Sequence, residues 1–450
     1  MVSGRDPDGL ELAERVLRHA EALGATQAEV LVGETESRLT RFANSEIHQN
    51  VAESNTMVNL RFVDGRRVGC ASTNRTDDGA LRRLADSAAR IARLMPEADE
   101  AVHLPGPAPI AYVHGAASVA TADATPEFRA AAAREVIAAA DAAGVQAYGS
   151  FTTDLEHVAL ANSLGVRAQE ARTWSQLLTV AMGSAGEAGY AEAAAVDCTS
   201  IDAGAVGREA AEKARSARQP VSVPPGDYPV VLEPYAVVDL LDMLGYLGIS
   251  GLAVQEGRSF FEPGKVVGSP LVTIVDDAAD VAGAPVSFDY EGVPKRRVPL
   301  IEAGVCREAV YDAQTAARAG RESTGHGLPA PNPYGPFPLN MVMHAGDASR
   351  DELIGGLDRG LLVTRFHYTN PVHPKLVIVT GMTRDGTFLV EHGRVVGPVR
   401  NLRFTQSYLD ALAGVQAVGR ERRLLRGFLG ASLVPALRIG AFTFTGATEH

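Results

Sequence analysis

A proline- and glycine-rich segment near the middle of the chain, Arg218 to Pro229, constrains the fold more than any other feature. Its prolines lack the backbone N–H that a helix or a central strand needs, so neither should run through it. The chain has 450 residues, which is enough for two or three domains. We therefore expect a domain boundary here, between an N-terminal domain of residues 1–222 and a C-terminal domain of residues 223–450.

The first domain should combine helices with antiparallel strands. Apolar residues recur at helical spacing from Asp8, the expected cap, to Leu23 and again from Asp77 to Met95. Thr125-Pro126-Glu127 opens a third helix, which Gly144 ends. Elsewhere apolar and polar residues alternate, which is typical of strands with one wet face. The expected strands are residues 28–32, 37–42, 57–63, 66–71, 147–153, 157–162 and 173–182, and the Asp-Gly at residues 64–65 predicts a hairpin turn.

The second domain should be mostly β-structure, because its apolar runs are short and punctuated by glycine and proline. One helix is expected from Pro234 to Leu244, which has proline in its first turn and one apolar face. Thr324 to Asn340 contains five prolines and three glycines and should be a long loop. The fold class is therefore α+β: an N-terminal domain resembling an α/β sandwich, followed by a β-rich C-terminal domain with one core helix.

Composition excludes several kinds of partner. The chain carries 42 basic and 54 acidic residues, and a net charge of −12 disfavours binding to nucleic acid. No apolar run approaches the ~18 residues of a membrane span, and the first ten residues lack a secretory pattern, so we expect a cytoplasmic protein. Cys70, Cys198 and Cys306 are too far apart to suggest a disulfide framework or a zinc motif, and we expect buried thiols.

Long stretches of the chain resemble the TldD/PmbA family, also called the TldD/TldE family of gyrase modulators and zinc peptidases. In the second domain they are VVLEPYAVVDLLDML, EGRSFFEPGKVVGSPLVTIVDD, FDYEGVPKRRVPLIEAGV, TGHG and GMTRDGTFLVEHGRVVGPVRNLRF. In the first domain RFANSEIHQNVAESNTMVNLRFVDGRRVGCAST fits the same family. The resemblance therefore covers nearly the whole chain.

The resemblance places Pro234 to Leu247 where catalytic members carry a zinc-binding helix with an HExxxH motif. Asp242 then falls at the first histidine, Met243 at the glutamate and Leu247 at the second histidine. A zinc hydrolase needs three protein ligands and a base, and neither thioether nor aliphatic side chains replace them. The family's last ligand is a cysteine, and Gly427 to Gly440 contains none. We therefore expect no catalytic residue, no metal ligand and no cofactor in this chain.

In lacking these zinc ligands, the chain resembles the non-catalytic TldE or PmbA branch of the family. The resemblance implies a chain that is inactive by itself and forms a heterodimer with an HExxxH-bearing TldD-type homologue, which holds the zinc. The pair would cleave a peptide or small amide substrate in a shared cleft. Because members of the family have varied roles, the resemblance also allows a role in natural-product or antibiotic biosynthesis. No residue of this chain supports that narrower hypothesis. Two alternatives stay open: a stand-alone amide hydrolase with an unrecognised site, and a homodimeric binding protein without peptidase activity.

Five residues of the second domain are candidates for contact with the substrate or the partner: His326, Phe366, His367, Tyr368 and Arg384. His326 lies between two glycines of the long loop. Residues 366–368 are expected to end a strand, and Arg384 belongs to Thr383–Thr387, where Asp-Gly predicts a hairpin turn. His367 and His373 form the only close histidine pair, and no carboxylate accompanies them at a ligand-like spacing.

Carboxylates and bases also lie close together at Asp289-Tyr290-Glu291-Gly292 and Lys295-Arg296-Arg297. Such a mixed run is usually solvent-exposed. We expect a surface ion-pair cluster of small energetic value.

Overall fold

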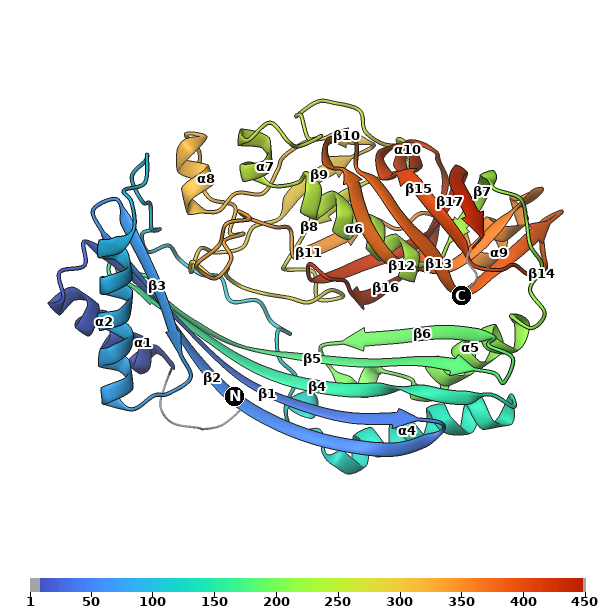
Figure 1. Cartoon of the computed structure of the whole chain (residues 1–450), viewed down its shortest axis with the longest axis horizontal. Coiled ribbons are helices and arrows are strands. Elements are labelled where there is room, and N and C mark those ends of the chain that lie inside the picture. Colours follow the sequence, from blue (N-terminus) through green and yellow to red (C-terminus); the bar gives the residue numbers. More distant parts are fainter. Residues whose placement is uncertain (1–8, 448–450) are drawn as a thin grey trace.

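The computed structural model describes residues 9–447 and contains two β-sheets (Figure 1). The first sheet is antiparallel throughout, in the order β3-β2-β1-β4-β5-β6. Its strands are β1 (Gln27–Ala43), β2 (Glu46–Asp64), β3 (Arg67–Thr73), β4 (Gln146–Asn162), β5 (Arg167–Met182) and β6 (Ala188–Ala195). The predicted hairpin at Asp64-Gly65 is confirmed, since Asp64 pairs with Arg67.

The long strands of this sheet were predicted in pieces. Residues 28–32 and 37–42 belong to the single strand β1, and residues 147–153 and 157–162 belong to β4. The polar residues between these pieces keep the pairing, with Thr35 opposite Glu156 and Ser37 opposite Asp154. Strand pairing therefore continues through polar positions, on the face of the sheet that the C-terminal half covers.

Helices cover one face of the first sheet. They are α1 (Gly9–Ala22), α2 (Asp78–Leu94), α3 (Val119–Ala122), α4 (Pro126–Ala142) and α5 (Ala203–Ser216), with the short 3-10 helix η1 (Cys198–Ser200). The three predicted helices are confirmed: Asp77 caps α2 and Thr125 caps α4. The expected cap of α1, Asp8, lies outside the described residues. The unpredicted α5 buries residues at helical spacing, but they are mostly alanine and glycine and were not recognised as an apolar face.

The second sheet contains the remaining strands, and part of it closes on itself. They are β7 (Gly226–Leu232), β8 (Ile274–Asp276), β9 (Val298–Glu302), β10 (Val305–Cys306), β11 (Asn340–Met343), β12 (Arg359–His373), β13 (Ile378–Glu391), β14 (Arg394–Pro398), β15 (Leu402–Ser407), β16 (Val415–Arg426) and β17 (Ala431–Ala447). The pairings β17–β15, β15–β13, β13–β12, β12–β7 and β7–β17 form a ring. The α+β class is confirmed.

The predicted core helix of the second half is α6 (Pro234–Leu247). Short helices accompany it: α7 (Gly251–Gln255), α8 (Ala313–Arg318), α9 (Arg350–Gly355), α10 (Tyr408–Ala413) and the 3-10 helix η2 (Pro374–Leu376). They are too short to show a helical period in the sequence. Residues 324–339 form the expected long loop. We call residues 9–217 the N-terminal half and residues 226–447 the C-terminal half.

The expectation that no strand enters Arg218–Pro229 is wrong for the last four residues of this segment. β7 begins at Gly226, contains Pro229 and pairs with strands on both sides. The register of β17 shifts between Ile439 and Phe442, opposite this proline. A bulge removes the need for a ladder hydrogen bond, so proline is tolerated there.

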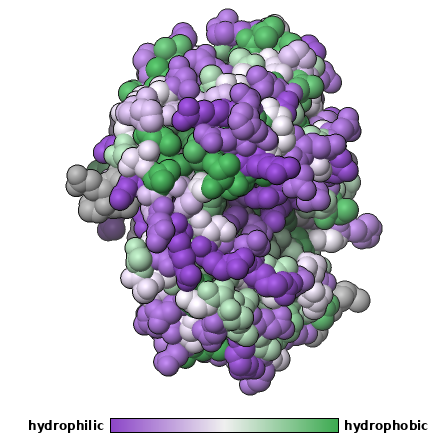
Figure 2. All heavy atoms as spheres, turned by 90° about the vertical axis from the view of Figure 1, so that its right-hand side faces the viewer, coloured by the Kyte–Doolittle hydropathy of each residue, from purple (hydrophilic) through white to green (hydrophobic). Residues whose placement is uncertain are grey.

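The face of the molecule seen in Figure 2 is largely polar. Figure 2 shows the side on which β14 lies, where apolar residues gather in one patch. Val395 and Val396 of β14 are exposed, as is Val221, which hydrogen-bonds to the end of the same strand. No helix within residues 9–447 is both long and apolar enough to cross a bilayer.

Candidate functional site

The helix α6 lies in the core of the C-terminal half. It is apolar almost all round, which is typical of a buried helix, and ten of its fourteen residues are buried. It packs chiefly against β12 and β17. The side chains that the family resemblance aligns with a metal site are therefore held by a rigid, packed element.

Asp242 anchors a loop rather than facing open solvent. Its side chain is 3% exposed, and its Oδ2 accepts a hydrogen bond from the backbone N–H of Phe428 at 2.8 Å. Its Oδ1 has no hydrogen-bond partner within residues 9–447. Burial raises the pKa of Asp242 to about 7; the Phe428 hydrogen bond opposes this rise and the charge of Asp239 adds to it. Gly427 has no space for a Cβ, because the Asp242 carboxylate occupies that position.

The side chains on this part of α6 do not fit a zinc ion. Met243 and Leu247 are buried, and they offer only a thioether and an aliphatic chain. Asp239 is already engaged, because it accepts hydrogen bonds from Thr369 at 2.7 Å and from the Tyr408 hydroxyl at 2.6 Å. Across the described part of the chain, no three histidine, cysteine or carboxylate side chains are grouped to hold a metal. Zinc sites need three or four such ligands.

A cavity of about 580 Å³ lies beside α6, and we call it the α6 cavity. Asp239, Asp242 and Met243 line it from the helix, and Arg426 lines it from the end of β16. Arg365 is ion-paired with Asp385 and lies 4.4 Å from the centre of the Tyr190 ring, which comes from β6 of the N-terminal half. Both halves therefore contribute to this cavity.

Buried charges join the start of α6 to the N-terminal half. Lys213 of α5 lies 2.6 Å from Glu233, the residue before α6, and 2.8 Å from Glu209. Arg350 contacts Glu233 at 3.1 Å, and Arg423 contacts Glu209 at 2.8 Å. Lys213 and Glu233 are both less than a tenth exposed. These ion pairs fix the position of α6 relative to α5.

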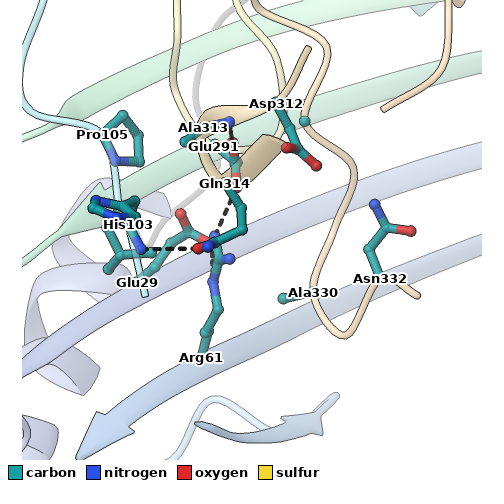
Figure 3. Close-up of polar contacts among 12 residues, drawn as sticks. Glu29, Arg61, His103, Pro105, Glu291, Asp312, Ala313, Gln314, Ala330 and Asn332 are labelled. Carbon is teal, nitrogen blue, oxygen red and sulfur yellow. Dashed lines mark hydrogen bonds and ion pairs between the residues drawn. The ribbon is translucent and has the colours of Figure 1, made fainter. Parts of the chain in front are cut away.

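A second group of buried charges joins the two halves around Glu291 (Figure 3). Arg61 of β2 lies 2.7 Å from Glu29 of β1 and 3.1 Å from Glu291. Glu291 also accepts a hydrogen bond from the backbone N–H of Ala313 at 2.8 Å. Burial disfavours the charge of Arg61, but the two carboxylates outweigh burial and hold the pKa of Arg61 above its ordinary value. Burial raises the pKa of Glu291 to about 8, although Arg61 opposes the rise.

The expectation of a surface ion-pair cluster at Asp289–Gly292 is wrong. Asp289 and Glu291 are 6% and 4% exposed. Asp289 accepts hydrogen bonds from the backbone N–H groups of Gly327 at 2.6 Å, Glu291 at 2.9 Å and Val293 at 2.9 Å. Burial raises the pKa of Asp289 to about 6 despite these donors. The N-terminal sheet and the long loop both bring partners to this turn. A charged segment whose sequence is typical of a surface is therefore buried.

His326 is buried behind the long loop, at 1% exposure. Its Nε2 lies 2.9 Å from Oδ1 of Asp276, and its Nδ1 lies 2.8 Å from the Thr324 hydroxyl. Lys295 contacts the same Asp276 oxygen at 3.1 Å. Burial alone would raise the pKa of Asp276, but Lys295 and His326 hold it well below its ordinary value. Burial lowers the pKa of His326. These contacts tie the long loop to β8.

The candidates on β12 differ in exposure. Phe366 is 6% exposed and packs against the rings of Phe404 and Phe442, whereas Tyr368 is 76% exposed. Both line the α6 cavity, and His367 between them does not. The strand does not end here as expected: it continues to His373 through an irregularity in its pairing with β13 after His367.

The hairpin turn expected at Thr383–Thr387 is also wrong, because β13 runs through this segment. Asp385 and Gly386 have φ values of 56° and 126°, and the register with β12 shifts at this point. Asp-Gly therefore makes a bulge within a strand. Arg384 projects from the bulge with its side chain 47% exposed, 3.8 Å from Asp385.

Another cavity, of about 480 Å³, lies between the first sheet and the C-terminal half, and we call it the inter-half cavity. It is lined by residues that include Thr35, Ser37, Asp154, Glu156, Arg172, Trp174, Phe288, Tyr290, His326 and Arg426. Sequence reasoning identified only His326 among these as a candidate. The alternating pattern shows which residues share a sheet face, but not that residues 284–290 and 426–431 cover that face.

Comparison with known proteins places the whole chain in one family. Models of the PmbA/TldA metallopeptidase family match at three places: domain 1 at residues 28–92, the central domain at residues 120–218 and the C-terminal domain at residues 225–446. The crystal structure of TldE from Thermococcus kodakarensis has the same fold, with a TM-score of 0.86, 21% identity and coverage of 96% of this chain and 99% of that chain.

Curated relatives match over a shorter span. A metalloprotease TldD homolog from Buchnera aphidicola is 29% identical over 45% of this chain and 42% of its own length. A metalloprotease from Methanothermobacter thermautotrophicus is 28% identical over 50% of each chain. The chain thus spans about half the length of the curated relatives it matches. With all three domain models present in order, the resemblance seen in the sequence is confirmed, and the chain belongs to the TldD/PmbA family of metallopeptidases.

Proposed function

We propose that this chain is the non-catalytic subunit of a heterodimeric zinc metallopeptidase of the TldD/TldE type. The observation that carries the proposal is the chemistry of α6, whose residues Asp242, Met243 and Leu247 fall at the family's metal and base positions by the resemblance in sequence. The one carboxylate among them holds the Phe428 backbone through Oδ2, and Met243 and Leu247 add no ligand beside it. The names of the relatives, metalloproteases and TldE, support a role in peptide or amide cleavage.

In this proposal the partner is an HExxxH-bearing TldD-type homologue, and it holds the zinc. This chain brings no cofactor. It stabilises the partner and completes the enclosure of a cleft for a peptide or small amide substrate, in the cytoplasm. The buried ion pairs of Glu233 and Glu291 support this role, because they fix the two halves of the chain relative to each other. A dedicated step in natural-product biosynthesis is a narrower form of the same proposal.

The test is to purify the chain alone and together with a TldD-type homologue from the same genome. Native mass, zinc content and peptidase activity are then measured for each chain and for the mixture. We expect a 1:1 complex, zinc only in the homologue, and activity that chelators abolish. One tightly held zinc per isolated chain, or amide cleavage by the isolated chain, would overturn the proposal in favour of a stand-alone hydrolase. A stable homodimer that ignores the homologue would instead indicate a binding protein.

A variant of α6 sharpens the test. Asp242→Ala should leave the activity of the assembled pair nearly unchanged, since Asp242 is not a ligand in this proposal. A loss of several orders of magnitude, with the complex still assembled, would assign chemistry to Asp242 and contradict the proposal.

A further inference from the structure

The floor of the inter-half cavity is a patch of six residues on one face of the first sheet: Thr35, Ser37, Asp154, Glu156, Arg172 and Trp174. The strand register makes them neighbours. Asp154 lies between Ser37 and Trp174, and Glu156 lies between Thr35 and Arg172. The helices pack on the opposite face, so this patch faces the C-terminal half.

Two carboxylates of this patch have no cation bound to them. Glu156 makes no hydrogen bond or ion pair within residues 9–447, and Asp154 accepts one hydrogen bond, from the Ser37 hydroxyl at 2.6 Å. Burial raises the pKa of Asp154, and the nearby charge of Arg426 opposes this rise. The carboxylate oxygens of Asp154 and Glu156 are therefore available to a cation that enters the cavity.

Aromatic rings form the adjoining walls, and guanidinium groups already lie over them. Arg172 lies 5.4 Å from the centre of the Phe288 ring and 5.8 Å from that of Tyr290. It is held in place by Glu170 at 2.9 Å and by the backbone oxygen of Phe288 at 3.1 Å. Cations over aromatic faces are attracted by the ring quadrupole. These walls are thus suited to a planar cation.

Arg426 differs from Arg172 because only the Trp174 ring and the more distant charge of Asp154 attract it. Its guanidinium lies 6.0 Å from the centre of the Trp174 ring, it is exposed, and its side chain has no hydrogen bond or ion pair within the described residues. The indole N–H of Trp174 is buried and also lacks a partner there. A ligand cation could therefore displace Arg426 from the face of Trp174, and the indole N–H of Trp174 would be available to the same ligand.

We infer that the inter-half cavity binds the guanidinium side chain of a basic peptide residue. In this arrangement Asp154 and Glu156 neutralise the bound cation, Trp174 stacks on it, and the indole N–H donates to a carbonyl oxygen of the ligand. Arg426 takes this position when no ligand is present. A carboxylate ligand would instead meet both acidic side chains. The inference concerns binding by this chain alone, so it is independent of the proposed partner subunit.

Trp174 is the only tryptophan of the chain, so its fluorescence reports on this cavity alone. The purified full chain is titrated with Nα-acetyl-L-arginine amide and, in parallel, with the citrulline analogue, which has the same shape without the charge. We expect a saturable change in fluorescence with the arginine probe and binding at least about tenfold weaker with the citrulline probe. Calorimetry on the same samples gives an independent measure of affinity.

Charge variants then test the roles of individual residues. Asp154→Asn and Glu156→Gln should each weaken binding of the arginine probe by about fivefold, whereas Arg426→Ala should strengthen it, because the competing cation is gone. Glu53→Gln is the matched control: Glu53 lies opposite Ser37 in the same sheet, is exposed and does not line the cavity. Its affinity should equal that of the unmodified chain. Circular dichroism verifies folding of each variant.

Three outcomes would overturn the inference. They are the absence of both a fluorescence change and binding heat at millimolar arginine probe, equal affinity for the citrulline probe, and weaker binding in Arg426→Ala. The last result would mean that Arg426 is itself a ligand-binding cation and that the cavity prefers anions. None of these results bears on whether the chain assembles with a zinc-bearing homologue.

Discussion

Arg61 should be the most sensitive charged position at the junction of the two halves. Its side chain is 15% exposed, and it lies between Glu29 and Glu291, which are 4% and 5% exposed. Arg61→Met preserves much of the volume but leaves buried Glu29 without its cation and buried Glu291 without its hydrogen-bond donor. Removing one member of a buried ion pair typically costs about 3–5 kcal/mol. We expect Arg61→Met to reduce the free energy of unfolding by about this amount.

The matched variant Glu291→Gln should behave differently. It leaves one carboxylate for one cation, Glu29 with Arg61, so its cost should be well below that of Arg61→Met. Its pH dependence has a definite sign. Burial raises the pKa of Glu291 from 4.5 to about 8, so between these values the folded chain binds more protons than the unfolded chain. The stability that protonated Glu291 contributes is complete below 4.5 and is lost as pH rises through about 8.

Urea unfolding followed by circular dichroism measures both effects. We expect the unmodified chain to lose stability relative to Glu291→Gln between about pH 5 and about pH 9, and Arg61→Met to be the least stable of the three throughout. An Arg61→Met variant within about 1 kcal/mol of the unmodified chain would refute the reasoning. So would a Glu291→Gln variant that is as destabilised as Arg61→Met, because the shared cation would then not be the stabilising element.

Three further predictions concern α6 and its loop. Burial raises the pKa of Asp242 from 3.8 to about 7, so the unmodified chain should lose stability relative to Asp242→Asn as pH rises across this range, measured by thermal unfolding; a constant difference would contradict this. Leu241→Asp should destabilise by about 4 kcal/mol or more, because Leu241 is fully buried and the new carboxylate has no partner; a normal yield of soluble protein with an unchanged melting temperature would count against it. Gly427→Ala should reduce the free energy of unfolding by about 1–3 kcal/mol, because the new methyl group clashes with Asp242. In urea unfolding, the double variant with Asp242→Ala should lose less stability than the sum of the two single variants. Strictly additive losses would argue against the clash.

Local sequence patterns anticipated most of the regular structure. The caps Asp77 and Thr125, the apolar stripes of α1 and α2, and the Asp64-Gly65 turn act over a few residues, so they can be identified without knowing the fold. The long loop of residues 324–339 follows in the same way from its prolines and glycines. The boundary segment shows the limit of local rules, because a bulge in distant β17 admits Pro229 into a strand.

The sequence by itself determined the chemistry available on α6. Met243 and Leu247 lack zinc-binding groups in any fold, and the apolar face of the segment predicted a core helix. Only the tertiary structure decided the environment of the charges. Glu291 is buried because Arg61, some 230 residues earlier, and the Ala313 backbone meet it. Arg426 reaches Trp174 only because β16 ends above the first sheet. Burial, charge pairing and cavities arise from contacts between residues far apart in the chain, and no local pattern encodes which of those contacts form.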